Sequence, residues 1–284
     1  MTDVVVTPAG ARLRVRTFGS ADAPIAIVAL HGFGQTADYL EPFANAVTRS
    51  GRVYLVAPDL RAHGDSDDFP PTGTADEVFV SDAHAVWSAR IGRPAVWFGN
   101  SLGARIAALT TAAHPEVASA LVLGECLAGL ERNWKFLLAG ARQLAAKRPA
   151  SFATLDEARA YALGQRGVKG DKGDIDVWLE HGLRARPEGG FVDKLRLGLV
   201  DAARWPDRPG DVERELGTIA VAVTLLYAER SAIPESQQRV VAGFIPGATL
   251  DHLAGAGHDL YLDVPELLAE RVCGLAIAAS EARY

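Results

Sequence analysis

The stretch "PAVWFGNSLGARIAALTTAA", residues 94–113, decides the fold class of this chain. It begins with a short apolar run that predicts a buried strand, passes through a glycine-rich turn and continues with helical character. The pattern recurs along the chain, with apolar runs at 25–32, 52–60, 118–125 and 219–229 and helix-length segments at 37–49 and 74–90. Apolar strands that alternate with helices predict βαβ units and a mostly parallel sheet covered on both faces.

The two ends and the middle of the chain complete the predicted layout. Residues 4–19 predict an opening hairpin that turns at residues 8–10, and residues 247–258 followed by 264–280 predict a last short strand and a closing helix. From residue 126 to 211 no strand pattern occurs. Apolar residues there recur at helical spacing in 133–148, 155–166 and 191–205, around a polar loop at 167–176. We therefore expect a core of residues 1–125 and 212–284 with a helical insertion at 126–211.

Bulk composition excludes several classes of function. Of the 284 residues 49% are hydrophobic, which is enough for a sizeable core, and the net charge of −6 disfavours nucleic acid as a partner. No leader segment and no apolar run long enough for a membrane span is visible, so a cytoplasmic protein is expected. Cys126 and Cys273 lack metal-site spacing, and no phosphate loop or nucleotide fingerprint occurs. We expect a small-molecule substrate and no cofactor; the sequence does not define an oligomeric state.

The glycine-rich turn "GNSLG", residues 99–103, predicts the chemistry. The pattern G-x-S-x-G between a strand and a helix is typical of a nucleophile elbow, which would make Ser101 the nucleophile. Its hydroxyl needs a base, and His258 lies between the last strand and the last helix, where it can reach the elbow. The glycines of "LHGFGQ" favour an oxyanion hole formed by the backbone N–H groups of Phe33 and Leu102. His252, inside the strand pattern, is expected to be structural.

The motifs "HGFG", "DLRAHGDS", "GNSLG" and "GAGHDLYLDVPE" occur in this order. In this respect the chain resembles the α/β-hydrolase superfamily over essentially its whole length. The resemblance implies a doubly wound sheet of about eight strands, a Ser–His–acid catalytic triad and an inserted helical cap over the substrate pocket. "DLRAHGDS" is similar to a structural loop of that family, although Ala62 and His63 stand where small residues are usual. Asp59 in this loop is therefore not expected to be catalytic.

The acid of the expected triad is not where the resemblance places it. In the family it usually follows the penultimate strand, but two alignments put Ser231 or Ala232 in its position. Glu125, at the end of the strand after the elbow helix, is our preferred candidate, because certain haloalkane dehalogenases place their acid there. Glu229 and Glu235 remain alternatives, as does a chain without any acid.

A serine nucleophile favours cleavage of an ester, lactone or thioester of a small, largely apolar substrate. Phe33, Asn100 and Trp134 are the expected substrate contacts. Asn100, before the serine, also resembles the elbow of the C–C hydrolases that act on meta-cleavage products, which keeps that reaction open. The third possibility is a ligand-binding relative without catalytic activity, which the missing aspartate would favour.

Overall fold

An eight-stranded sheet forms the centre of the computed structural model, which describes residues 1–165, 172–201, 204–205, 210–231 and 233–281. The strand order is β1-β2-β4-β3-β5-β6-β9-β10. The strands are β1 (Thr2–Val6), β2 (Arg12–Phe18), β3 (Ile25–Leu30), β4 (Val53–Pro58), β5 (Ala95–Asn100), β6 (Ala118–Gly124), β9 (Ala222–Ala228) and β10 (Thr249–Leu253). β1 and β2 pair antiparallel, as do β2 and β4, and all other neighbours are parallel. The predicted mostly parallel sheet and the opening hairpin are confirmed.

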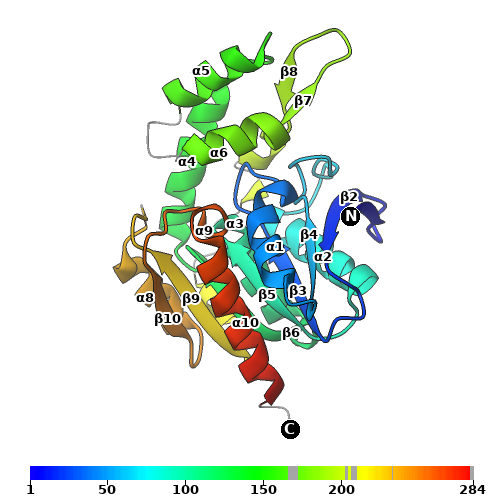
Figure 1. The fold of residues 1–284 in the computed structure, drawn as a ribbon. Coiled ribbons are helices and arrows are strands. Elements are labelled where there is room, and N and C mark those ends of the chain that lie inside the picture. The colour runs from blue at the N-terminus through cyan, green and yellow to red at the C-terminus, as the bar shows by residue number, and fades with distance from the viewer. Residues whose placement is uncertain (166–171, 202–203, 206–209, 232, 282–284) are drawn as a thin grey trace.

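Helices cover both faces of the sheet (Figure 1). They are η1 (Ala37–Leu40), α1 (Glu41–Thr48), α2 (Ala75–Arg90), α3 (Leu102–Ala113), η2 (Pro115–Val117), α7 (Asp211–Leu216), α8 (Glu235–Phe244), α9 (Leu260–Asp263) and α10 (Pro265–Glu281). Along β3, Val28 and Leu30 join the core beneath α2, α3, α7 and α8, whereas Ile27 and Ala29 join the core beneath α1 and α10. Alternate side chains of a strand point to opposite faces, so a strand covered on both faces is apolar throughout.

The insertion, defined here as the residues between β6 and α7, lies over one edge of the sheet (Figure 1). It contains α4 (Glu131–Lys147), α5 (Leu155–Gln165), α6 (Lys172–Val177), the π-helical turn η3 (Trp178–Gly182), the strands β7 (Leu183–Ala185) and β8 (Phe191–Asp193), and the short helix η4 (Leu197–Val200). The helices expected at 133–148 and 155–166 are confirmed by α4 and α5, and residue 166 lies outside the described residues.

Two predictions for the insertion were wrong. The predicted helix at residues 191–205 begins instead as strand β8, which pairs antiparallel with β7. The connecting turn contains Gly189 and Gly190, both with positive φ (96° and 78°), a conformation that glycine adopts at little cost. Of the polar loop predicted at 167–176, residues 172–176 belong to helix α6, and residues 167–171 lie outside the described residues. Three-residue strands are too short to show a periodicity, which is why the pattern concealed them.

Among the described residues, no helix combines the length and the apolar character that crossing a bilayer requires.

Candidate active site

Ser101 occupies a strained turn between β5 and α3. Its backbone lies at φ 55° and ψ −113°, a region that non-glycine residues rarely adopt and that recurs at functional sites. The turn is possible because its glycines bring strand and helix together. A Cβ on Gly99 would lie 2.2 Å from the Gly103 carbonyl oxygen, and one on Gly103 would lie 2.2 Å from the carbonyl oxygen of Leu30. The structure thus forms the sharp elbow that the motif predicted.

Glu125 directly follows strand β6 and lies beside Ser101. β5 and β6 are parallel, and Asn100 pairs with Gly124, so the two following residues emerge side by side at the same sheet edge. The N–H of Ser101 donates to the Gly124 carbonyl oxygen at 2.8 Å. Glu125 also has a positive φ of 50° and is fully buried. A buried carboxylate in a strained backbone conformation requires partners.

These partners come from the last residue of β9 and from the loops that follow β9 and β10. Glu125 Oε1 accepts the N–H of Ala228 at 2.9 Å, and Oε2 lies 3.3 Å from His258 Nδ1. The hydroxyl of Ser231 donates to the same Oε2 atom. Ser231, which takes the usual place of the acid, therefore contacts the carboxylate that faces the histidine. Glu125 and His258 are brought together although 133 positions separate them in the chain.

His258 has the surroundings of a base that can become charged. Desolvation lowers its pKa, but the hydrogen bond with Glu125 and the negative charges of Asp259, Glu125 and Asp263 outweigh this effect and raise the pKa above 6.5. Its side chain is 43% exposed, so the ring remains accessible. Within the described residues no hydrogen bond links Ser101 Oγ to the ring, a contact that often forms only when substrate is bound.

The alternative acids lie elsewhere. Glu229 is exposed at the end of β9, and its Oε2 accepts the N–H of Gly255 at 2.6 Å. Glu235 starts α8 and pairs with Arg239. Ala232, the second alignment position for the acid, is outside the described residues.

The expected oxyanion donors lie in two tightly held segments. Leu102 is fully buried at the start of α3, and Phe33 is in the turn after β3. Among the described residues, neither backbone N–H donates to another protein group. Gln35 Oε1 accepts the N–H of Gly32 at 3.0 Å and the hydroxyl of Tyr261, and Gln35 Nε2 donates to Asp259 Oδ1 at 2.8 Å. The Phe33 turn is therefore linked to the loop that carries His258.

Two buried histidines attach the same turn to the "DLRAHGDS" loop. His31 Nε2 accepts the N–H of Leu60, and His63 Nε2 accepts the N–H of Gly34, both at 3.0 Å. Each Nδ1 then donates to a carbonyl oxygen, that of Gly32 for His31 and that of Arg61 for His63. Desolvation lowers the pKa of His31 to about 4 and that of His63 to about 3. Both rings are therefore neutral at pH 7, and each fixes the turn with one donor and one acceptor.

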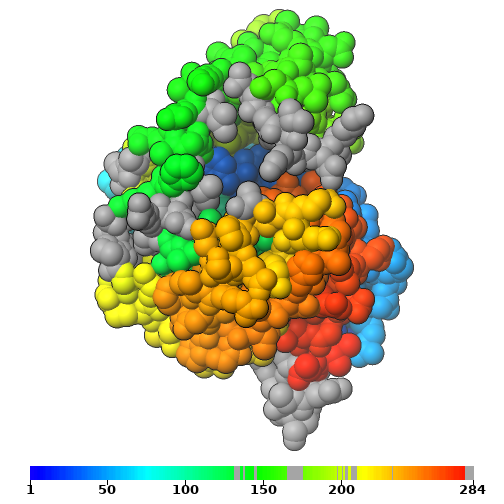
Figure 2. All heavy atoms as spheres, turned by 90° about the vertical axis from the view of Figure 1, so that its left-hand side faces the viewer, coloured from blue at the N-terminus to red at the C-terminus, as the bar shows by residue number. Residues whose placement is uncertain are grey.

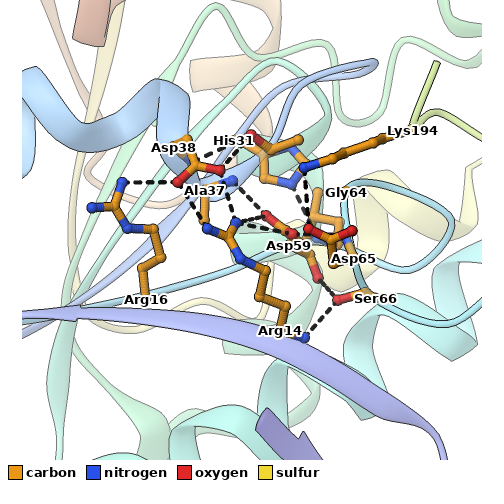
Figure 3. Close-up of polar contacts among 12 residues, drawn as sticks. Arg14, Arg16, His31, Ala37, Asp38, Asp59, Gly64, Asp65, Ser66 and Lys194 are labelled. Carbon is orange, nitrogen blue, oxygen red and sulfur yellow. Dashed lines mark hydrogen bonds and ion pairs between the residues drawn. The ribbon is translucent and has the colours of Figure 1, made fainter. Parts of the chain in front are cut away.

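Asp59 serves this loop in a structural role (Figure 3). It is fully buried, faces the guanidinium of Arg14 at 3.2 Å, and accepts the N–H groups of Ala37 and Asp65 at 2.7 and 2.9 Å. Burial raises the pKa of Asp59, while Arg14 and these two donors oppose the rise. In the same view Lys194 of the insertion reaches Asp65 at 3.1 Å, which connects the insertion to the loop.

Comparison with known proteins agrees with this architecture. A sequence profile described as the alpha/beta hydrolase family matches residues 27–271, which is most of the chain. This chain is an alpha/beta hydrolase. No curated protein sequence matches it detectably.

Solved structures of several hydrolytic enzymes have the same fold at low sequence identity. E-2-(acetamidomethylene)succinate hydrolase has a TM-score of 0.80 and 20% identity, over 97% of this chain and 98% of that one. An M. tuberculosis esterase has a TM-score of 0.78 and 18% identity, over 97% and 91%. The thioesterase domain of the curacin biosynthetic pathway has a TM-score of 0.76 and 18% identity, over 96% and 99%. At these identities the likeness establishes the fold alone.

The expected substrate contacts have different positions in this alpha/beta hydrolase. Phe33 is half-buried, with its ring edge-on to His63 at a centroid distance of 6.0 Å. Asn100 is fully buried, and its Nδ2 donates to the His258 carbonyl oxygen at 2.9 Å, so its amide holds the histidine loop. Trp134 belongs to α4, and its side chain is outside the described part of the structure. Figure 2 shows a hollow between the insertion and the C-terminal part of the core.

Sequence reasoning missed Gln35, Tyr261 and the contribution of Ser231 to the site. Gln35 lies inside the stretch "LHGFGQ" and Tyr261 inside "GAGHDLYLDVPE", but a glutamine or tyrosine there has many ordinary roles. Ser231 was noticed only as the residue that replaces an acid. Its hydrogen bond to Glu125 could not be inferred without the positions of β6 and β9.

Proposed function

We propose that this alpha/beta hydrolase is a serine hydrolase that cleaves a carboxylic ester or thioester through an acyl-enzyme on Ser101. His258 is the base and Glu125 is the acid of the triad. One observation carries the proposal: a buried carboxylate beside the elbow lies 3.3 Å from Nδ1 of the histidine whose loop follows the last strand. The absence of an acid at Ser231 is then a relocation from β9 to β6.

In the first half-reaction Ser101 Oγ attacks the substrate carbonyl carbon while His258 Nε2 takes the hydroxyl proton. Glu125 accepts a hydrogen bond from Nδ1–H of His258, so Nε2 carries no proton and can act as the base. The carboxylate also stabilises the imidazolium that forms. The carbonyl oxygen becomes an oxyanion held by the N–H groups of Phe33 and Leu102. Collapse of this intermediate breaks the bond to the alcohol or thiol, which leaves with the proton from His258.

In the second half-reaction water takes the place of the alcohol. His258 removes a proton from water, the resulting hydroxide attacks the acyl carbon, and the acyl–Ser101 bond breaks as the proton returns to Oγ. The products are the free acid and the regenerated enzyme. A preorganised oxyanion hole serves both steps, because each passes through a tetrahedral intermediate.

The residues beside the site support a small, largely apolar acyl group. Phe33, in the turn after β3, and Leu195, beside that turn, are partly buried apolar side chains that pack on the same core. Leu195 comes from the insertion, and a Cβ built on Gly34 would lie 3.7 Å from its Cδ2 atom. Apolar walls with a few fixed polar donors are typical of small-molecule sites. The contact between Asn100 and the His258 loop explains this asparagine without a C–C hydrolase reaction.

A covalent-labelling experiment tests the proposal. The purified protein is treated with a fluorophosphonate, and the adduct is followed by intact mass for the wild type and for Ser101→Ala. We expect one adduct per chain in the wild type and none in the variant. The same proteins are then assayed with p-nitrophenyl esters of increasing acyl length and with acyl thioesters.

The outcomes separate the remaining possibilities. Labelling together with ester or thioester turnover supports the proposed reaction. Labelling without turnover of any acyl substrate would point to another serine-dependent reaction, such as C–C bond hydrolysis. A folded wild type that is not labelled would contradict catalysis at Ser101 and favour a ligand-binding protein.

A further inference from the structure

Two histidines and a glutamate converge near the C-terminal end of α3, opposite the end that follows Ser101. His84 stacks on His114 with ring centroids 4.1 Å apart. Glu116 Oε1 lies 3.7 Å from His84 Nε2 and 3.7 Å from His114 Nδ1. The three potential ligand atoms all lie within 4.8 Å of one another. The residues come from α2, from the end of α3 and from η2.

We propose that His84, His114 and Glu116 form a binding site for Zn²⁺. A zinc ion with ligands at about 2.05 Å in tetrahedral arrangement places neighbouring ligand atoms about 3.3 Å apart. The two nitrogen–oxygen distances of 3.7 Å are therefore within about 0.4 Å of what coordination requires. The histidine rings must open from their stack, which is feasible because both side chains are 33% exposed.

The ligand set favours zinc over the hard cations. Two imidazole nitrogens and one carboxylate oxygen suit Zn²⁺ and related transition metals, whereas Mg²⁺ and Ca²⁺ prefer oxygen ligands alone. Water would take the fourth position, because Glu116 is 59% exposed and the site is open to solvent. The one carboxylate also compensates part of the charge of the ion.

The position of the cluster, away from the elbow, indicates a structural role for the ion. α3 has twelve residues from Leu102 to Ala113, so His114 is about 18 Å from the elbow along the helix. At the other end of these helices, Arg105 of α3 already binds both carboxylate oxygens of Asp76 of α2, at 2.9 and 2.7 Å. A zinc ion would add a second connection between α2 and the segment that leads into β6. It would stabilise the fold without participating in the hydrolytic reaction.

Calorimetric titration of the untagged, EDTA-treated protein with ZnCl₂ in a non-chelating buffer tests this site. We expect one ion per chain and an affinity at least about 100-fold weaker in His84→Ala, His114→Ala or Glu116→Gln, since even partners beyond the direct ligands contribute 10- to 100-fold. His252→Ala, which removes an exposed histidine on β10, is the matched control and should bind as the wild type does.

Thermal unfolding provides a readout that separates this cluster from the active-site histidine. Zinc at about 100 times its Kd should raise the Tm by about 5 °C in the wild type and in His258→Ala, but not in His114→Ala. Circular dichroism checks that each variant is folded. The proposal is overturned if the wild type binds no zinc, or if binding survives His114→Ala and disappears in His258→Ala.

Discussion

Replacement of Glu125 by glutamine tests the relocated acid with a minimal change of shape. Glu125 Oε1 accepts the N–H of Ala228 at 2.9 Å, and this buried donor needs an oxygen acceptor. In Glu125→Gln the amide oxygen must therefore take the Oε1 position. The NH₂ group then occupies the position of Oε2, which lies 3.3 Å from His258 Nδ1.

This orientation of the amide reverses the tautomer of His258. An NH₂ group can only donate, so Nδ1 becomes the acceptor and the proton moves to Nε2, the atom that should receive the proton of Ser101. The equivalent neutralisation in a serine protease lowers turnover about 10⁴-fold. His258 is 43% exposed, and solvent reduces the effect of a lost charge. We therefore expect a loss of about 10³- to 10⁴-fold in kcat, or about 4 to 5.5 kcal/mol in activation free energy.

The assay measures kcat for a p-nitrophenyl ester together with the rate of fluorophosphonate labelling, and near-ultraviolet circular dichroism verifies the fold. Glu229→Gln is the matched control, because Glu229 is an exposed carboxylate on the adjacent loop that bonds Gly255 instead of the histidine. It should retain activity within about twofold, as expected for a surface change away from the reacting groups.

A second substitution tests the site from the opposite direction. The Ser231 hydroxyl donates directly to the carboxylate oxygen that faces His258, so Ser231→Asp in the Glu125→Gln background restores a carboxylate beside the ring. We expect this double variant to recover at least about tenfold of the lost kcat. If Glu125→Gln is folded and retains activity within about threefold of the wild type, Glu125 is not the acid.

Three further outcomes follow from the geometry. The neutral form of His258 is the base and its pKa is raised above 6.5, so kcat/KM should fall on acidification with a midpoint above pH 6.5. In Glu125→Gln that midpoint should move to lower pH. A pH–rate profile in which it does not move would contradict the contact between Glu125 and His258. Gln35→Ala releases the Phe33 turn and should lower kcat by up to about 10²-fold with a smaller change in KM, measured by steady-state kinetics. Gly103→Ala should destabilise the fold by about 3 kcal/mol, because its Cβ would lie 2.2 Å from the Leu30 carbonyl oxygen; an unchanged urea midpoint would show that the elbow can relax.

The local sequence was sufficient to predict the sheet and the elbow. A strand buried on both faces must be apolar throughout, so β3, β4, β5 and β6 were each visible as a short apolar run. The elbow was equally visible, because Gly99 and Gly103 have no space for a side chain where strand, turn and helix meet. Such features depend on neighbours in the chain and on one packing requirement.

The hairpin of the insertion was not visible for the opposite reason. β7 and β8 have three residues each, and their pairing depends on a turn at Gly189 and Gly190 that the periodicity of the flanking residues does not report. A run of apolar residues in 191–205 fits a helix equally well in isolation. Contacts beyond this segment, such as the backbone pair between Phe152 and Phe191, select the strand.

The sequence by itself determined which residues could be nucleophile and base, because Ser101 and His258 belong to motifs whose chain order suits the sheet. For the acid, a resemblance favoured Glu125, but only the tertiary structure shows which glutamate faces the histidine. Glu125, Glu229 and Glu235 all lie near the same sheet edge, and their spacing in the chain does not rank them. The β6-β9-β10 strand order and the positive φ of Glu125 place its carboxylate against His258. Glu229 instead accepts a hydrogen bond from Gly255, and Glu235 forms an ion pair with Arg239. The direction of a side chain at a strand end depends on backbone angles and neighbouring strands, which no local pattern encodes.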